Sequence, residues 1–178
     1  MTSLYQNPSG SFVFTFLTFE ADTAGGYTLN SYDSATATAS SHVYDPVLHA
    51  SIMTDPDNAA TKIGYLVYES FDYASQELLE DAVNELKSAG MKELVLDLSF
   101  NMGGSVAQSR WLAGCIAGSA NWSKTFANAV YSDGKVEKWT FDYGYDNNTE
   151  NLGLPIDLGL KRVYAIRSYN TASDAELI

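Results

Sequence analysis

The chain has 178 residues, which is enough for one domain with a sizeable buried core. Its 22 acidic and 10 basic residues give a formal net charge of -12, which repels nucleic-acid backbones and anionic membrane surfaces, so we expect no nucleic-acid partner. Hydrophobic residues make up 46 %, but no run of 18 apolar residues occurs, so the chain is neither disordered throughout nor expected to hold a membrane-spanning segment.

The first third of the chain is predicted to be β-rich and irregular. The apolar run over residues 12–17 is typical of a buried strand. Gly25-Gly26 predicts a turn into a second short strand over residues 27–30. Residues 31–42 are rich in Ser, Thr and Ala and favour a loop or an exposed edge strand.

The middle of the chain predicts a strand–helix–strand unit. Strands are expected over residues 47–53 and 62–68, and a helix follows over 75–89, where Ser75 suits the N-cap and Gly90 the end. The short apolar run 93–98 comes next, and a right-handed crossover would place it parallel to the strand 62–68.

The last third continues the alternation of strands and helices. We expect a helix over 105–118, a hairpin of strands 124–131 and 136–143 around Asp133-Gly134, a polar loop over 144–153, a strand over 161–168, and a helix that opens near Ser173. The pattern as a whole predicts the α/β class.

Two turns between a strand and a helix carry small residues that could present backbone N–H groups to an anion. They are Asn101-Met102-Gly103-Gly104 and Thr171-Ala172-Ser173. A glycine pair lets a substrate approach the backbone closely, and a serine at a helix start can act as a nucleophile. Taken alone, the glycine pair also suits a tight connection, and Ser173 also suits a helix N-cap.

The order of these motifs resembles one family, the tail-specific or C-terminal processing serine peptidases. That family carries an IGYL…F strand, a DLRxNxGG turn and a TASASE nucleophile motif, in this order. The matching segments here are Ile63-Gly64-Tyr65-Leu66 with Phe71, Asp97-Leu98 with Asn101 and Gly103-Gly104, and Thr171-Ala172-Ser173 with Glu176. Three ordered motifs are more specific than any one of them.

The resemblance implies the roles of three residues. Ser173 matches the nucleophile of the family, and the backbone N–H groups of Gly103 and Asp174 match the two donors of its oxyanion hole. Gly104 is a less favoured substitute for Gly103. Because members use a Ser/Lys dyad, the resemblance implies neither a metal nor another cofactor.

The resemblance also implies an architecture and a setting. Residues 61–178 would form the peptidase core, a Clp/crotonase-like fold of ββα units. Residues 1–60 would be a β-rich N-terminal segment that forms part of a PDZ-like or other N-terminal module. The expected substrate is a peptide or protein held by its C-terminal tail, and the expected location is the bacterial cell envelope, periplasmic or secreted, although the first residues do not read as a signal peptide.

The general base of the family does not occur in the printed sequence. In the family this lysine follows the nucleophile, whereas the chain ends at Ile178. Lys161 opens the last predicted strand, about 20 Å from Ser173, so it cannot replace that base. We therefore expect a core that is truncated after the nucleophile motif and that has no peptidase activity on its own.

Two substitutions within the motifs keep an alternative function open. Ser99 stands where the family usually has arginine, so any charge pairing made at this position is lost. Asp174 stands where the family has alanine, and its carboxylate either points to solvent or opposes the developing oxyanion. The alternative is a non-catalytic, peptide-binding relative of the peptidases.

The remaining reactive side chains predict no further site. His42 and His49 flank Asp45 without the spacing of zinc ligands, so no metal site is expected. Cys115 is the one cysteine, so it cannot form an internal disulfide and is expected to be buried.

Overall fold

The computed structural model describes residues 10–38, 44–142 and 152–178. The chain divides into two compact units after Val43. The sequence favours a boundary near residue 60, but strand β3 (Val47–Thr54) pairs with β4 (Lys62–Tyr68) and so belongs to the second unit. The relation of the N-terminal segment to a PDZ-like module stays a prediction.

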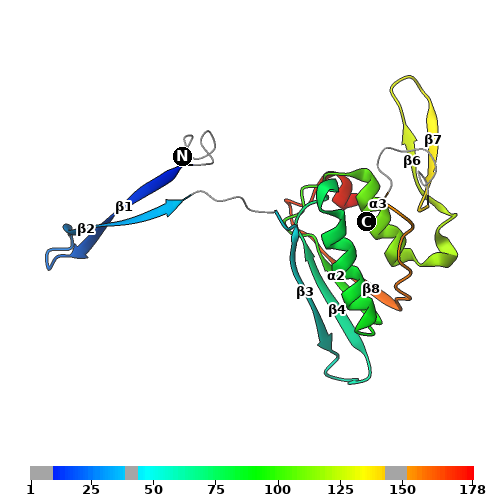
Figure 1. The fold of residues 1–178 in the computed structure, drawn as a ribbon, viewed down its shortest axis with the longest axis horizontal. Coiled ribbons are helices and arrows are strands. Elements are labelled where there is room, and N and C mark those ends of the chain that lie inside the picture. The colour runs from blue at the N-terminus through cyan, green and yellow to red at the C-terminus, as the bar shows by residue number, and fades with distance from the viewer. Residues whose placement is uncertain (1–9, 39–43, 143–151) are drawn as a thin grey trace. The chain divides into compact units, whose positions relative to one another are not determined.

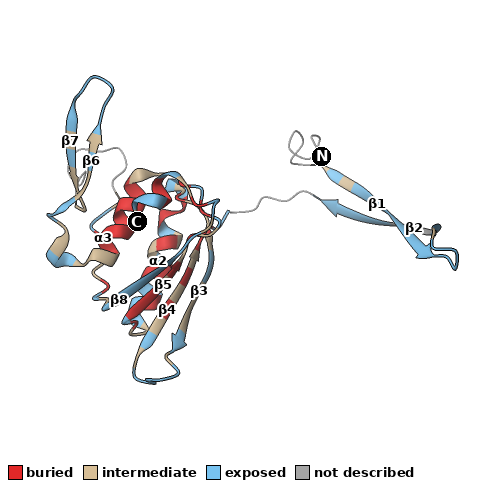
Figure 2. Ribbon diagram, turned by 180° about the vertical axis from the view of Figure 1, so that it is seen from behind, coloured by how far each residue is buried: buried red, intermediate tan, exposed pale blue. Residues whose placement is uncertain are grey.

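The first unit is a two-stranded antiparallel sheet of β1 (Ser11–Ala21) and β2 (Tyr27–Thr38), joined at the predicted glycine turn. The prediction that the apolar run of β1 is buried is wrong, because Phe14 and Phe16 are 39 % and 52 % exposed. Within the described residues of this unit, no second layer covers either face of the two strands (Figure 2). The Ser/Thr/Ala-rich stretch extends β2, and its last residues, 39–42, lie outside the described residues.

The second unit is built on a four-stranded sheet in the order β3-β4-β5-β8 (Figure 2). Strands β5 (Glu93–Asp97) and β8 (Arg162–Ile166) lie parallel to β4, as predicted for β5, whereas β3 is antiparallel to it. Parallel strands end at the same edge of a sheet. The segments that follow β5 and β8 therefore start side by side, and the Leu98 N–H donates to the Ile166 carbonyl oxygen at 2.9 Å.

Two helices of this unit pack on the sheet. Helix α2 (Gln76–Ser88) follows a single 3-10 turn, η1 (Tyr73–Ser75). After its C-cap residue, Ala89, the chain turns at Gly90, whose φ of +85° suits glycine. Helix α3 (Val106–Ala117) begins at Ser105, whose hydroxyl caps it. Both helices lie where their sequence patterns predict them, so the mixed α/β class is confirmed.

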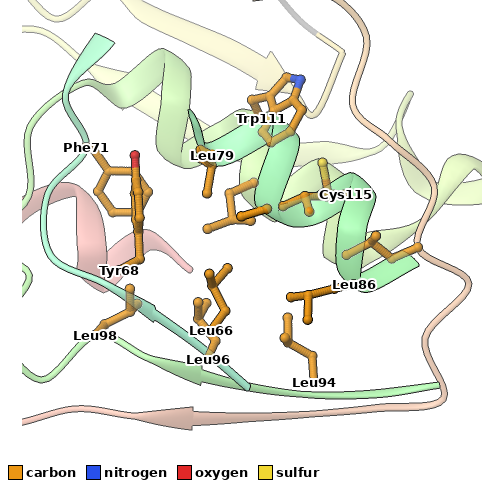
Figure 3. Packing of buried hydrophobic residues seen from close by; sticks show 14 of the residues in the cluster. Leu66, Tyr68, Phe71, Leu79, Leu86, Leu94, Leu96, Leu98, Trp111 and Cys115 are labelled. Carbon is orange, nitrogen blue, oxygen red and sulfur yellow. The ribbon is translucent and has the colours of Figure 1, made fainter. Parts of the chain in front are cut away.

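The core lies between the sheet and these helices (Figure 3). Alternate side chains of β4 and β5 point to the helices, as the apolar pattern predicts. The buried residues of the cluster include Leu66, Tyr68, Leu94 and Leu96 from the strands, Leu79, Val83 and Leu86 from α2, and Trp111, Leu112 and Cys115 from α3. Cys115 is buried as predicted, and burial raises the pKa of its thiol to about 12.

The remaining elements complete the second unit. They are η2 (Ser119–Asn121), the antiparallel hairpin of β6 (Thr125–Val130) and β7 (Val136–Thr140), and the 3-10 helix η3 (Ser173–Leu177), which contacts α3 (Figure 1). The hairpin turn at Asp133-Gly134 is confirmed, while most of the predicted polar loop over 144–153 lies outside the described residues. In the described parts of the chain, no helix is both long and apolar enough to cross a membrane.

Candidate active site

Hydrogen bonds join the segment after β8 to the segment that follows β5. Thr171 is buried, and its hydroxyl donates to the Leu98 carbonyl oxygen at 2.7 Å. The Ala172 N–H donates to the Asn101 carbonyl oxygen at 3.2 Å. The structure thus brings together the two turns that the sequence singled out.

Ser173, the predicted nucleophile, begins η3 with an unusual backbone conformation. Its φ is +55°, and no other non-glycine residue among those described has a positive φ. The left-handed conformation costs an L-residue about 1–2 kcal/mol, and such strain is concentrated at functional sites. Ser173 is exposed, its hydroxyl forms no hydrogen bond with any residue that the structure describes, and the N-cap position of η3 belongs to Ala172. The Ser173 side chain therefore does not serve as the N-cap of η3.

The glycine turn lies directly against Ser173. A Cβ added to Gly103 would lie 2.5 Å from the Ser173 Cβ and 3.0 Å from its Oγ. Gly103 also has a φ of +101°. Both the close approach and the backbone conformation require glycine at this position.

Asn101 organises the glycine turn, a role that the sequence analysis did not assign. It is fully buried, its Nδ2 donates to the Tyr68 carbonyl oxygen at 3.1 Å, and its Oδ1 accepts the Gly103 N–H at 2.9 Å. Its backbone carbonyl also holds Ala172. An asparagine two residues before a glycine is a known turn signal, so the Asn-Met-Gly spacing could have identified this role.

The backbone N–H groups at the site have different partners. The Gly103 N–H donates to the Asn101 side chain, and the Gly104 N–H donates to Asp174 Oδ2 at 3.2 Å. The Asp174 N–H has no acceptor among the residues that the structure describes. Of the two predicted oxyanion donors, the Asp174 N–H is therefore unengaged and the Gly103 N–H is already bonded.

The Asp174 side chain does not point to solvent. The residue is 8 % exposed, and its carboxylate faces the glycine turn. Burial raises the pKa of this carboxyl group, and the hydrogen bond from the Gly104 N–H acts in the opposite direction. The solvent-facing alternative is therefore wrong, and a buried acidic group lies beside the candidate nucleophile.

The carboxylate of Asp97, two residues before Ser99, accepts two hydrogen bonds at the end of β5. Its Oδ1 accepts the Ser99 N–H at 2.9 Å, and its Oδ2 accepts the Tyr65 hydroxyl at 3.0 Å. Burial acts to raise the pKa of Asp97, but the hydrogen bonds from Ser99 and Tyr65 outweigh it and hold this pKa below its ordinary value. Hydrogen bonds from Ser99 and Tyr65 therefore favour the ionised form of the carboxylate at the end of β5.

We expect Tyr65→Phe to lower stability at neutral pH and to have a smaller effect in acid. Because the pKa of Asp97 is lowered in the folded protein, its contribution is present above the ordinary pKa of about 4 and is lost as the pH falls through the folded-state pKa. Loss of the hydroxyl removes the hydrogen bond that it donates to the charged Asp97 carboxylate, so the folded state is less stable at neutral pH. Urea unfolding followed by tryptophan fluorescence across the acid range measures this; an equal loss at every pH would contradict it.

The other candidate groups lie away from this site or outside the description. His49 Nε2 is hydrogen-bonded to Ser51 Oγ within β3 at 2.9 Å, and His42 lies outside the described residues. Lys161 precedes β8, at the end opposite to the turn that carries Ser173. In the described ranges, no three His, Cys, Asp or Glu side chains gather as a metal site would require.

A mixed α/β protein with an exposed, strained serine against a glycine turn falls in the class of candidate serine hydrolases. The comparison with protein families identifies the particular family. The model of peptidase family S41 matches residues 62–178, so this chain belongs to peptidase family S41. This membership confirms the resemblance seen in the motifs.

Solved structures show the same fold. A protein described as an S41 protease from Bacteroides fragilis is 24 % identical with a TM-score of 0.66, over 94 % of this chain and 43 % of that one. The photosystem II D1 C-terminal processing protease is 18 % identical with a TM-score of 0.52, over 82 % of this chain and 35 % of that one. This chain thus spans less than half of either protein. Among curated proteins, none matches this chain.

Proposed function

We propose that the chain is the nucleophile-bearing part of a serine endopeptidase of the C-terminal processing type. The observation that carries the proposal is Ser173 itself, an exposed residue held at a positive φ with its side chain against Gly103. Membership of peptidase family S41 supports peptide-bond hydrolysis as the reaction. The exposed side chains of Phe100, Met102 and Tyr169, in the two connections that meet here, support an extended peptide as the substrate.

In the proposed reaction, the Ser173 Oγ adds to the carbonyl carbon of the scissile bond while its proton passes to a general base. The oxyanion accepts hydrogen bonds from the N–H groups of Asp174 and Gly103, each worth about 3 kcal/mol. The C–N bond then breaks, the amine leaves with the proton, and water hydrolyses the acyl-enzyme. The Gly103 N–H must be shared with, or released from, Asn101 Oδ1 during this step.

The proposed general base is the lysine that the family resemblance implies. In the described parts of the chain, no lysine is hydrogen-bonded or ion-paired to Ser173. A lysine acts as a base only where burial lowers its pKa from about 10.4 towards 7, which requires an apolar niche beside the serine. We therefore propose that these 178 residues alone do not hydrolyse peptides.

The finer parts of the proposal extend the family resemblance. They are a Clp/crotonase-like core of ββα units, an N-terminal segment derived from a PDZ-like module, recognition of the substrate through its C-terminal tail, and a location in the bacterial cell envelope. The photosystem II D1 C-terminal processing protease, by its name, acts on a C-terminus, which supports the tail-directed mode.

One observation favours the alternative of a non-catalytic, peptide-binding relative. Both N–H groups of the glycine turn already have side-chain acceptors, Asn101 Oδ1 for Gly103 and Asp174 Oδ2 for Gly104. A site that only binds peptides does not need these donors for an oxyanion. The two functions therefore differ in whether Ser173 reacts.

Covalent labelling of the natural polypeptide at its full length decides between them. We expect an alkyl fluorophosphonate to phosphonylate the wild-type protein on Ser173, with fluoride as the leaving group, and Ser173→Ala to abolish labelling. The matched control is Ser123→Ala, at another exposed serine, which is expected to label at the wild-type rate. Equal labelling of wild type and Ser173→Ala, or no labelling of either, would contradict the nucleophile assignment.

A further inference from the structure

The carboxylate of Asp174 occupies a backbone donor next to the proposed nucleophile. Its Oδ2 accepts the Gly104 N–H at 3.2 Å, at the long end of the hydrogen-bond range. The residue is 8 % exposed, and among the described residues it has neither a basic partner nor a second donor. A buried carboxylate with one long hydrogen bond is poorly compensated for the loss of its hydration. In the described structure, the hydrogen bond from the Gly104 N–H is therefore the one interaction that directly offsets the lost hydration of the Asp174 carboxylate.

The contact between the Asp174 side chain and the Gly104 N–H lies at the site of the proposed reaction. Asp174 directly follows Ser173, and Gly104 directly follows Gly103, so the contact joins the two turns that form the site. The backbone N–H of Asp174 is a proposed oxyanion donor, whereas its side chain brings negative charge to the same turn. Like charges repel strongly where water is excluded, so this carboxylate and a substrate oxyanion compete for one region.

We propose that the Asp174 side chain is an internal inhibitory ligand of the glycine turn: while it accepts the Gly104 N–H, its negative charge lies beside the turn that supplies the proposed oxyanion donors and opposes the substrate oxyanion. The inference rests on the proposed function, because it concerns regulation of the same site. It assigns the side chain and the backbone of one residue opposite effects: the N–H supports the reaction and the carboxylate slows it.

The test compares rates of fluorophosphonate labelling at Ser173 in the natural polypeptide at its full length. Asp174→Asn removes the charge and keeps an acceptor for the Gly104 N–H, whereas Asp174→Ala removes both. We expect both variants to be labelled at least about tenfold faster than wild type, the effect expected of about 1.4 kcal/mol. Asp174→Ala is expected to be the faster of the two, because it also frees the Gly104 N–H, the less favoured candidate for the second oxyanion donor.

A matched control makes the same Asp-to-Asn change at a position outside the motifs. Asp81 is exposed in α2, and the labelling rate of Asp81→Asn is expected to stay within about twofold of wild type. Amide hydrogen exchange gives a second readout, since the Gly104 N–H should exchange faster in Asp174→Ala than in wild type. A merely structural role of Asp174 would not accelerate labelling.

The outcomes separate this inference from the proposed function. Labelling that depends on Ser173 but is equal or slower in the Asp174 variants overturns the inhibitory role alone. Labelling that persists in Ser173→Ala, or that is absent throughout, overturns the proposed function and the inference with it. Thermal unfolding checks that the variants fold; if Asp174→Ala does not, the near-isosteric Asp174→Asn decides.

Discussion

Gly104→Ala is expected to lower the free energy of unfolding of the second unit by more than about 3 kcal/mol. An added Cβ would lie 2.1 Å from the Phe71 carbonyl oxygen and 2.8 Å from its carbonyl carbon. Both atoms belong to backbone, so neither can rotate away. Gly104 also has a φ of +140°, a conformation that L-residues rarely adopt. Urea unfolding followed by tryptophan fluorescence measures the loss.

The backbone bridge at Phe71 explains why this position is so sensitive. The Phe71 N–H donates to the Gly103 carbonyl oxygen at 3.0 Å, and the Ser105 N–H donates to the Phe71 carbonyl oxygen at 2.8 Å. Phe71 itself is 2 % exposed and part of the core. Accommodating alanine at position 104 separates these partners and disturbs both the core and the N-cap of α3.

The matched control for this substitution is Gly90→Ala. Gly90 has a similar requirement for positive φ, +85°, but the nearest atoms to an added Cβ are those of the Lys62 side chain at 3.9 Å, an ordinary contact. We expect a loss of about 1–2 kcal/mol from the backbone conformation alone. Equal losses in Gly104→Ala and Gly90→Ala would contradict the steric role of Gly104.

Much of the second unit could be predicted because its patterns are local. The alternation of buried and less buried residues in Lys62–Tyr68 and the amphipathic face of α2 indicate which side chains pack together. The residues Asp133-Gly134 predict the hairpin turn without reference to the rest of the chain. The burial of β1 could not be predicted in this way. A run such as residues 12–17 is equally apolar whether or not a second layer covers it, and burial depends on that layer.

The sequence predicts which residues form the candidate site, but it does not predict which of their atoms contact one another. The motifs identify Ser173 and the glycine turn, because only particular residue types suit such turns. The partners of the N–H groups depend on two segments about 70 positions apart meeting at one sheet edge. The sequence therefore does not predict where the Asp174 side chain points, and it assigns Asn101 no role beyond its place in a motif.

Asn101→Ala is expected to destabilise the second unit by about 2–4 kcal/mol and to slow labelling of Ser173. The substitution leaves two buried backbone groups, the Tyr68 carbonyl and the Gly103 N–H, without their side-chain partner. Each unsatisfied group costs about 1–3 kcal/mol. The Gly103 turn then loses the anchor that holds it against Ser173, so reactivity falls together with stability. Urea unfolding and the rate of fluorophosphonate labelling measure the two effects.

Asn128→Ala is the matched control for the loss of an asparagine side chain. Asn128 is exposed on β6, and its side chain has no hydrogen bond to a described residue, so the variant is expected to unfold within about 0.5 kcal/mol of wild type. If Asn101→Ala were as stable as Asn128→Ala, the glycine turn would not depend on the Asn101 side chain. If it were less stable but Ser173 reacted at the wild-type rate, the side chain would support the fold without positioning the nucleophile.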